Sequence, residues 1–189
     1  MKCLASRIRQ RGENVSMATM VDLLIRDATF DDLGAMLAIY NEQVLTSTST
    51  FDLRERSQEA QHAWFLQHQE GLHPVVVGER AGQVVAWGSL SVYKPRPAYQ
   101  HTVEVSVYVH QQARSQGLGT VLLKHLCERG QSSGVHTIVA YIVSSNQASL
   151  RMSRACGFVE AGRLREVGYK FDTWLDVVIM QRILHPSLD

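Results

Sequence analysis

Residues 114–119, with the sequence RSQGLG, have the composition of a loop that binds an anion. They follow the strand-like stretch TVEVSVYV and precede the helix-like stretch TVLLKHL. Gly117 and Gly119 leave the backbone uncovered and reach φ values that other residues avoid. Successive N–H groups in such a turn form a nest for an anion, and the start of the following helix favours negative charge. The pattern therefore predicts a phosphate site, to which Arg114 would add a positive charge.

Two common phosphate loops do not fit these residues. A Walker loop requires Gly-Lys followed by Ser or Thr, whereas the chain continues GTVLLK from its second glycine. A dinucleotide fingerprint requires a third glycine at the position of Leu122. The remaining pattern is R-x-x-G-x-G at a junction between a strand and a helix. Taken alone, this spacing is equally typical of a tight turn that needs flexible residues.

The elements that must hold this loop follow a definite order along the chain. Apolar patterning predicts strands at residues 21–27, on both sides of a turn at 80–82, at 103–109, in VHTIVAYIV, and on both sides of a turn in GYKFDT. Helical spacing and capping residues predict helices after Thr29, from Ser57 to about Glu70, from the glycine loop to near Gly130, and in SNQASLRMSRACGF. This order predicts a mixed α/β or α+β domain with a mostly antiparallel central sheet flanked by helices.

Length and composition limit the class of protein. The chain has 189 residues, of which 45% are hydrophobic and 20% are charged. We therefore expect one domain at residues 21–185, after a disordered leader at residues 1–20. The net charge of +1 gives no basic footprint for nucleic acid. No apolar run approaches the roughly 20 residues that span a bilayer, so we expect no membrane association.

The cysteines and histidines do not form the spacings of a metal site or a disulfide framework. Cys3, Cys127 and Cys156 are odd in number and form no CxxC pair, which indicates a reducing, cytoplasmic compartment. The eight histidines include no HExxH motif, so we expect no metal. Cys127 and Cys156 lie among apolar residues with no paired base. We expect them to be buried structural thiols rather than acyl carriers.

Several separated segments together resemble the GNAT superfamily of acetyl-CoA-dependent N-acetyltransferases. These segments are RSQGLGTVLL after a strand and NQASLRMSRACGF about thirty residues later. The segments RPAYQHTVEVSVYV and GYKFDTWLDVVIMQ resemble the branch that acetylates phosphinothricin and methionine sulfoximine. The resemblance implies a sheet that splays between its fourth and fifth strands, with acetyl-CoA in the wedge. It also implies a small amino-acid-like amine as the acceptor, and a homodimer.

The resemblance assigns the cofactor to the strand before the glycine loop and to the loop itself. Contacts to the acetyl and pantetheine groups are implied for Val107, Tyr108 and Val109, and the N–H near Val109 would polarise the thioester carbonyl. Asn146 would reach the pantetheine arm. The pyrophosphate would be wrapped by Ser115, Gln116, Gly117, Leu118, Gly119 and Thr120, with Arg114 beside them. Ser115 departs from the family, whose members often have glycine there, and it fits only if its backbone angle suits a residue with Cβ.

Glu104 is the candidate proton acceptor, because only a neutral amine attacks a thioester. It shares a strand face with Ser106 and Tyr108, and partial burial would raise its pKa toward the working range. Without the resemblance, an ordinary glutamate on the sheet surface fits this position better. The family often has a tyrosine or histidine at the position of Ser153, to protonate the leaving CoA thiolate. Serine is a poor acid, so Ser153 would at most pass a proton through water, or the thiolate would leave unaided.

The loop KPRPAY supplies candidate groups for the carboxylate of the acceptor. Lys94 and Arg96 offer positive charge, and Pro95 stiffens the loop together with the second proline. A solvated basic loop is an equally good interpretation. Tyr99 is a further candidate for the acceptor site. Candidate walls of the same pocket are Lys170, Phe171 and Trp174.

Two other functions fit parts of the same sequence. The enzyme class would be kept if the acceptor were a protein N-terminus, a lysine, a polyamine or an antibiotic. A non-catalytic module that binds acyl-CoA is suggested by serine at positions 115 and 153, where the family pattern differs. The basic KPRPAY loop favours an acceptor that carries a negative charge.

Overall fold

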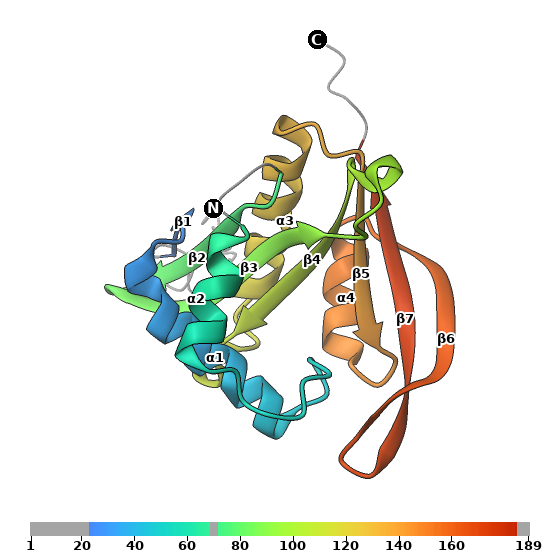
Figure 1. Cartoon of the computed structure of the whole chain (residues 1–189), viewed down its shortest axis with the longest axis horizontal. Coiled ribbons are helices and arrows are strands. Elements are labelled where there is room, and N and C mark those ends of the chain that lie inside the picture. Colours follow the sequence, from blue (N-terminus) through green and yellow to red (C-terminus); the bar gives the residue numbers. More distant parts are fainter. Residues whose placement is uncertain (1–22, 69–71, 185–189) are drawn as a thin grey trace, which may run out of the picture.

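The computed structural model describes residues 23–68 and 72–184. One seven-stranded sheet has the order β1-β2-β3-β4-β5-β7-β6, and all neighbouring strands are antiparallel except β4 and β5 (Figure 1). The strands are β1 (Leu24–Asp27), β2 (Val75–Arg80), β3 (Gln83–Val92), β4 (Thr102–Val109), β5 (Thr137–Val143), β6 (Val159–Lys170) and β7 (Thr173–Ile183). The helices are α1 (Leu33–Thr46), α2 (Gln58–Leu66), α3 (Leu118–Ser132) and α4 (Gln147–Ala155), with short 3₁₀ turns η2 (Phe30–Asp32), η3 (Pro97–Tyr99) and η4 (Gln111–Ala113).

Helices cover both faces of the sheet, and each face has its own apolar core. On one face, Met36 and Tyr40 of α1 pack with Trp87 of β3 and with α2. On the other, Leu122 of α3 and Leu150 of α4 pack against residues of β3, β4, β5 and β7. Figure 1 shows α1 and α2 together over the strands β2 to β4, and α4 beside β5. The two layers confirm the predicted mixed fold with flanking helices.

The sheet opens between its two parallel strands. Pairing between β3 and β4 runs from Val92–Val103 to Ala86–Val109, along nearly the whole of β4. Pairing between β4 and β5 ends at Glu104–Val139. Beyond that pair the strands diverge toward their C-terminal ends (Figure 1). The predicted opening between the fourth and fifth strands is therefore present.

The ends of some elements differ from the prediction. The first strand is described from Leu24, where its pairing with β2 starts at Leu24–Glu79, and positions 21 and 22 of the predicted strand lie outside the described residues. The second helix ends at Leu66 rather than near Glu70. His68 Nδ1 lies 2.8 Å from the Trp64 carbonyl oxygen, so the His68 side chain engages a carbonyl of the last turn. The predicted leader at residues 1–20 lies outside the described residues.

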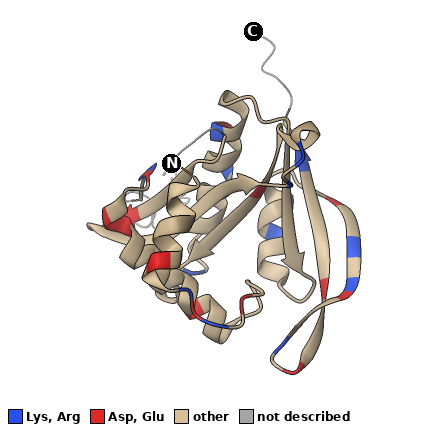
Figure 2. Ribbon diagram, viewed as in Figure 1, with Lys and Arg blue, Asp and Glu red and all other residues tan. Residues whose placement is uncertain are grey.

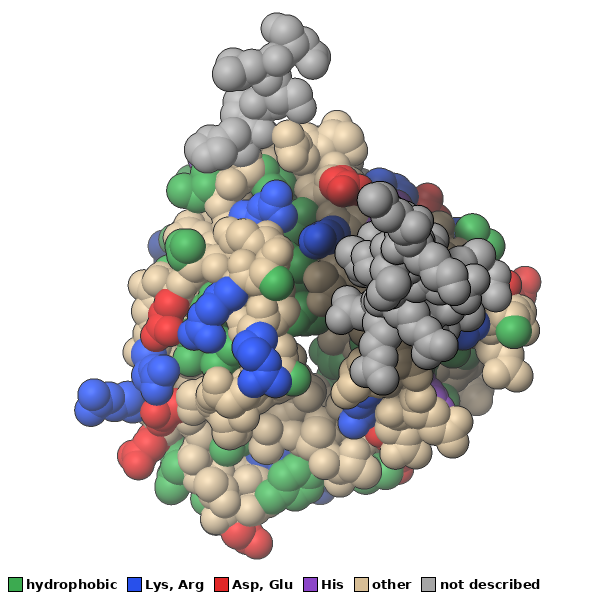
Figure 3. All heavy atoms as spheres, turned by 180° about the vertical axis from the view of Figure 1, so that it is seen from behind, with side chains coloured by type: hydrophobic (Ala, Val, Ile, Leu, Met, Phe, Trp, Pro, Cys, Tyr) green, Lys and Arg blue, Asp and Glu red, His purple; other side chains and the backbone are tan. Residues whose placement is uncertain are grey.

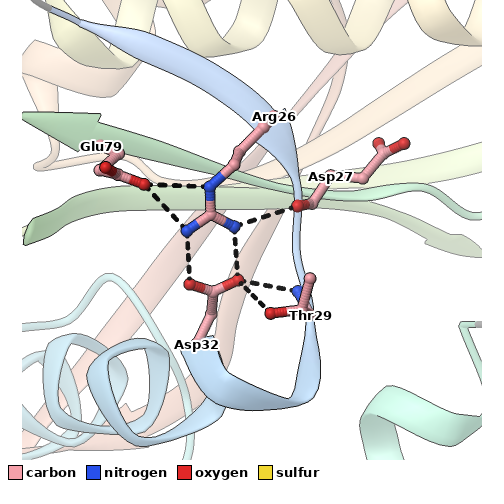
Figure 4. A network of polar contacts seen from close by, with 5 residues as sticks. All are labelled: Arg26, Asp27, Thr29, Asp32 and Glu79. Atoms are coloured by element: carbon pink, nitrogen blue, oxygen red, sulfur yellow. Dashed lines mark hydrogen bonds and ion pairs between the residues drawn. The ribbon is translucent and has the colours of Figure 1, made fainter. Parts of the chain in front are cut away.

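A polar network fixes the start of α1 to the edge of the sheet (Figure 4). Arg26 donates two hydrogen bonds to the Asp32 carboxylate, of 2.7 and 2.8 Å, and a third to Glu79 of β2 at 3.0 Å. The Asp32 carboxylate also accepts from the Thr29 N–H at 2.8 Å, which fits the predicted cap of this helix. The Arg26 hydrogen bonds hold the pKa of Asp32 below its ordinary value. The network positions α1 over the face of the sheet that carries Tyr108.

Charge is mixed rather than gathered by sign over the ribbon. Figure 2 shows both acidic and basic residues along β6, with others scattered elsewhere. Within the described ranges, no helix has the length and apolarity needed to cross a membrane. No group of three or more His, Cys, Asp and Glu side chains in those ranges could hold a metal ion. Cys127 and Cys156 are buried free thiols, and burial raises the pKa of Cys127 to about 11.

Candidate functional site

The opening between β4 and β5 leaves part of the β4 main chain without a partner strand. The His110 N–H donates to the Val85 carbonyl of β3 at 2.9 Å, so residues in step with His110 direct their peptide groups toward β3. By alternation, Val107 and Val109 direct theirs toward β5, where strand pairing has already ended. Figure 3 shows an opening through the molecule in this region, with Lys and Arg side chains beside it. A ligand with amide groups can pair with this exposed edge.

The glycine loop after β4 has the backbone of an anion nest. Ser115 and Gly117 have φ values of 61° and 80°, on either side of Gln116. The N–H groups of Thr120 and Val121 both donate to the Gly117 carbonyl, which begins α3. The N–H groups of Leu118 and Gly119 precede these and have no acceptor within the helix. Ser115 therefore does not have a backbone angle that suits a residue with Cβ: it lies in the left-handed region, which costs a serine roughly 1–2 kcal/mol and which glycine would occupy freely.

The two glycines of the loop serve different purposes. A Cβ at Gly117 would meet open space, so the φ of 80° is what requires glycine there. At Gly119, a Cβ would lie 2.8 Å from Met152 Sδ of α4 and 3.7 Å from Val109 Cγ2. Gly119 thus allows the start of α3 to approach the Met152 side chain of α4, whereas the distance to Val109 is an ordinary contact. The positive φ at Gly117 is a property of the loop alone, whereas the close approach at Gly119 depends on α4.

The arginine of the loop is held by an acidic partner from α1. Arg114 Nη2 lies 2.7 Å from Glu42 Oε1, and Arg114 Nε donates to the Val109 carbonyl at 3.2 Å. The second oxygen, Glu42 Oε2, is buried without a hydrogen-bond partner among the described residues. A further cation that the sequence analysis missed is Arg80 at the end of β2, whose Nη1 donates to Gln116 Oε1 at 2.5 Å. Two guanidinium groups therefore lie at the nest.

Glu104 lies at the last paired position before the opening. It is opposite Ser91 of β3 and Val139 of β5, on the sheet face that α1 and α2 cover. The residue is partly buried, and this burial raises the pKa of its carboxyl. Val107 and Val109 belong to the core on the opposite face. The strand thus separates a carboxylate on one face from the glycine loop and α3 on the other.

The KPRPAY loop lies at the end of β3 and carries its charges at the surface. Lys94 Nζ is 4.8 Å from the Tyr93 ring centroid and 5.4 Å from that of Tyr99. Arg96 is exposed and makes no ion pair with the described residues. Tyr99 is partly exposed and stacks edge-on against Tyr93. The two cations are therefore available to an anionic ligand.

The two predicted site residues at α4, Asn146 and Ser153, both make structural contacts. Asn146 Oδ1 accepts the Ser149 N–H at 3.1 Å and so caps α4, which leaves its amide NH₂ group as the donor for a ligand. Ser153 is 1% exposed and lies on the packed side of the helix with Leu150. Its hydroxyl is therefore closed to solvent in this structure.

The hairpin of β6 and β7 meets the segment between α1 and α2. Lys170 is buried, and its Nζ donates to the Thr50 carbonyl at 2.9 Å. Gly168 lies directly against the Phe51 ring. Of the other predicted pocket walls, Phe171 and Trp174 are more than half exposed.

A group of side chains on the α1 and α2 face was not predicted from the sequence. The Arg56 guanidinium lies 4.1 Å above the Tyr40 ring, and Tyr40 Oη donates to Asp52 at 2.6 Å. Tyr141 of β5 donates to the hydroxyl of Tyr93 at 3.4 Å. These contacts join residues far apart in sequence, so no local pattern in the chain predicts them.

Comparison with known proteins gives concordant matches. The chain matches a family model described as an acetyltransferase (GNAT) domain over residues 25–179. It is 38% identical over 164 residues to the L-methionine sulfoximine/L-methionine sulfone acetyltransferase of Pseudomonas aeruginosa strain PAO1, covering 86% of this chain and 95% of that relative.

Two solved structures are similar in both fold and sequence. One is a GNAT superfamily phosphinothricin acetyltransferase of Sinorhizobium meliloti in complex with acetyl-CoA, at a TM-score of 0.84, 30% identity, and coverage of 89% of this chain and 92% of that one. The other is a ribosomal-protein-alanine N-acetyltransferase of Brucella melitensis, at a TM-score of 0.83, 41% identity, and coverage of 85% and 99%.

Proposed function

Because the chain belongs to the GNAT acetyltransferase family, we propose that it transfers the acetyl group of acetyl-CoA to the amine of a small amino-acid-like acceptor. The acceptor is of the methionine sulfoximine, methionine sulfone or phosphinothricin type, as the names of its relatives suggest. The observation that carries the proposal is the unpaired edge of β4 between the glycine nest and Glu104.

In this proposal the cofactor lies along the main chain. The pyrophosphate occupies the nest of Ser115 and Gly117 and the start of α3, with Arg80 and Arg114 as nearby cations. The pantetheine amides pair with the free edge at Val107 and Val109. The thioester lies at the end of the pantetheine away from the pyrophosphate, so the N–H of Val107, nearer to Glu104, stabilises the negative charge that develops on the thioester oxygen.

In the proposed reaction the acceptor nitrogen attacks the thioester carbonyl carbon. A new C–N bond forms, the C–S bond breaks, and CoA leaves as the thiolate. Glu104 accepts the proton that the amine loses, directly or through water. The buried position of Ser153 supports departure of the thiolate without a protein acid, which is chemically reasonable for a thiol with a pKa of about 8.5.

The proposed acceptor site lies on the α1 and α2 face. Glu104 attracts the amine, while Lys94 and Arg96 lie on the loop that follows β3 and attract the carboxylate. The absence of ion pairs at Arg96 among the described residues supports this role, because no partner must be displaced. Pro95 limits the conformations of the loop before the ligand binds.

A second candidate is acetylation of a protein N-terminus. It is favoured by the 41% identity to the ribosomal-protein-alanine N-acetyltransferase. A panel of amines separates the two functions: L-methionine sulfone, L-methionine sulfoximine, phosphinothricin, spermidine, and a peptide that begins with alanine. We expect thiol release from acetyl-CoA with the first three and the acetylated product by mass spectrometry.

Other outcomes of the panel would overturn the proposal. Release with the peptide alone would establish the second candidate. Tight binding of CoA by calorimetry, with no release for any amine, would leave a non-catalytic acyl-CoA-binding module.

We further propose that the enzyme works as a cytoplasmic homodimer. The free, buried thiols Cys127 and Cys156 suit a reducing compartment. The edge hairpin carries exposed apolar side chains that a second copy would cover, namely Leu164, Val167, Phe171 and Trp174. Light scattering should give twice the chain mass, and Trp174→Glu should reduce it to one chain. A monomeric wild type would disprove this assembly.

A further inference from the structure

Two tyrosine hydroxyls meet above the sheet beside Glu104. Tyr93 follows the end of β3 and Tyr141 lies on β5, so they stand on opposite sides of β4. Their hydroxyl oxygens are 3.4 Å apart, although the residues are 48 positions apart in the chain. Both side chains are partly exposed. Neither has a role in the site as proposed above.

The register of the sheet brings this pair to the level of Glu104. Ser91 and Val139 are the two neighbours of Glu104 across the ladders. Tyr93 lies two residues beyond Ser91, and Tyr141 lies two residues beyond Val139, so both share the face of Glu104. Because β3 and β5 run in opposite directions, the two side chains start on either side of Glu104 and must converge toward it for their hydroxyls to meet.

The direction of the hydrogen bond leaves one donor free. Tyr141 donates its hydrogen to the Tyr93 oxygen, and the Lys94 ammonium stands 4.8 Å from the Tyr93 ring centroid. The Tyr141 hydrogen bond, aided by Lys94, lowers the pKa of Tyr93. The hydrogen of Tyr93 itself is thus available to donate outward. The separation of 3.4 Å also exceeds the optimum of about 2.7–2.8 Å, so both hydroxyls can turn toward a third oxygen atom.

We propose that the Tyr93 and Tyr141 hydroxyls together bind an oxygen atom of the acceptor, and so select acceptors that carry an oxygen-bearing group within reach of the amine. This inference rests on the proposed function. The ligand group is an oxygen with full or partial negative charge, because Lys94 and two O–H donors surround it. Two parts of an amino-acid acceptor supply such an oxygen: the α-carboxylate, and the oxo group of a sulfone, sulfoximine or phosphinate side chain.

The test removes the Tyr141 hydroxyl and leaves its ring, as Tyr141→Phe. Tyr169→Phe is the matched control, because Tyr169 is an exposed tyrosine on β6, whose hydroxyl contacts Asp172 in the turn of the same hairpin. For L-methionine sulfone we expect Tyr141→Phe to lower kcat/KM about tenfold, mainly through KM, as for loss of one hydrogen bond to a charged group. The KM for acetyl-CoA should stay unchanged, and the control should match the wild type.

Two ratios of kcat/KM, each between methionine sulfone and a second acceptor, show which acceptor oxygen the hydroxyls bind. If Tyr141→Phe lowers the preference for methionine sulfone over methionine, the hydroxyls bind the side-chain oxo group. If it lowers the preference for methionine sulfone over its carboxamide, they bind the α-carboxylate. Either result supports the inference.

An equal loss for all these acceptors would overturn it, because a merely structural tie between β3 and β5 would not discriminate among them. No change in any acceptor would overturn it as well. These results differ from failure of the proposed function, in which the wild type itself acetylates none of the amino acids, and which would remove both claims.

Discussion

The two sides of the β4 strand are built from different parts of the chain. On the cofactor side, the groups that we expect to bind are main-chain N–H groups, set by the φ values of Ser115 and Gly117 and by the free edge of β4. On the acceptor side, they are side chains from separate elements, namely Glu104, Tyr93 and Tyr141. The first side depends on local conformation and tolerates many side chains. The second depends on which residues the sheet brings together, so it is the side on which selectivity can vary.

The largest effect is expected at Glu104, which stands between the two sides. Glu104→Gln keeps the size of the side chain but cannot accept the amine proton. We expect kcat/KM for the acceptor to fall by about 10² to 10⁴, which is the usual contribution of a general base. The dissociation constant of acetyl-CoA should not change, because the carboxylate faces away from the nest. A variant that keeps nearly full activity would show that the base is another group or water alone.

The cofactor side can be broken separately at Gly117. A valine there must leave the φ of 80°, at a cost of roughly 1–2 kcal/mol or more, or hold the loop under strain. We expect the affinity for acetyl-CoA to weaken at least about tenfold by calorimetry. Gly82→Val is the matched control, since Gly82 has a φ of 76° and open space around it, but lies in the turn between β2 and β3.

Both glycine variants should lose stability, and only Gly117→Val should lose cofactor affinity. Equal affinities in the two would show that the nest is not where the pyrophosphate binds.

A smaller effect is expected from a change of pH. It should alter kcat/KM, which depends on ionised Glu104, and leave cofactor binding at the nest unchanged. Burial raises the pKa of Glu104 above its ordinary value of 4.5, and the base works only when it is ionised. As pH falls through this raised pKa, kcat/KM should decrease, up to tenfold per pH unit. The affinity for CoA should stay flat over the same range. Glu104→Gln should lack this acid limb, and an identical limb in the variant would assign it to a different group.

The sequence allowed the cofactor side to be predicted more fully than the acceptor side. Glycine spacing and strand alternation are local, so the glycine loop and the strand before it could be read from them, whereas the free edge at Val107 and Val109 was implied only by the family resemblance. Even there, the close approach at Gly119 depends on α4, because a Cβ at that position would require the Met152 side chain to shift. Tyr141 could not be predicted, since its contact with Tyr93 depends on two ladders that meet at Glu104. The ion pair between Arg114 and Glu42 joins residues 72 positions apart, so the local sequence pattern could not predict it.

The smallest effect is expected at the contact between the β6–β7 hairpin and the segment before α2. Gly168→Ala would overlap the Phe51 ring and push it aside, at a cost of about 1–3 kcal/mol in the free energy of unfolding. Because Phe51 lies next to Asp52, which holds Tyr40 on the acceptor face, we expect KM for the acceptor to rise a few-fold. The KM for acetyl-CoA should stay constant. In a Phe51→Ala background, Gly168→Ala should cost much less stability than it does in the wild type, because the overlap is gone. If the two changes are additive instead, the ring and the glycine are not in contact in solution, and the hairpin does not support the acceptor side.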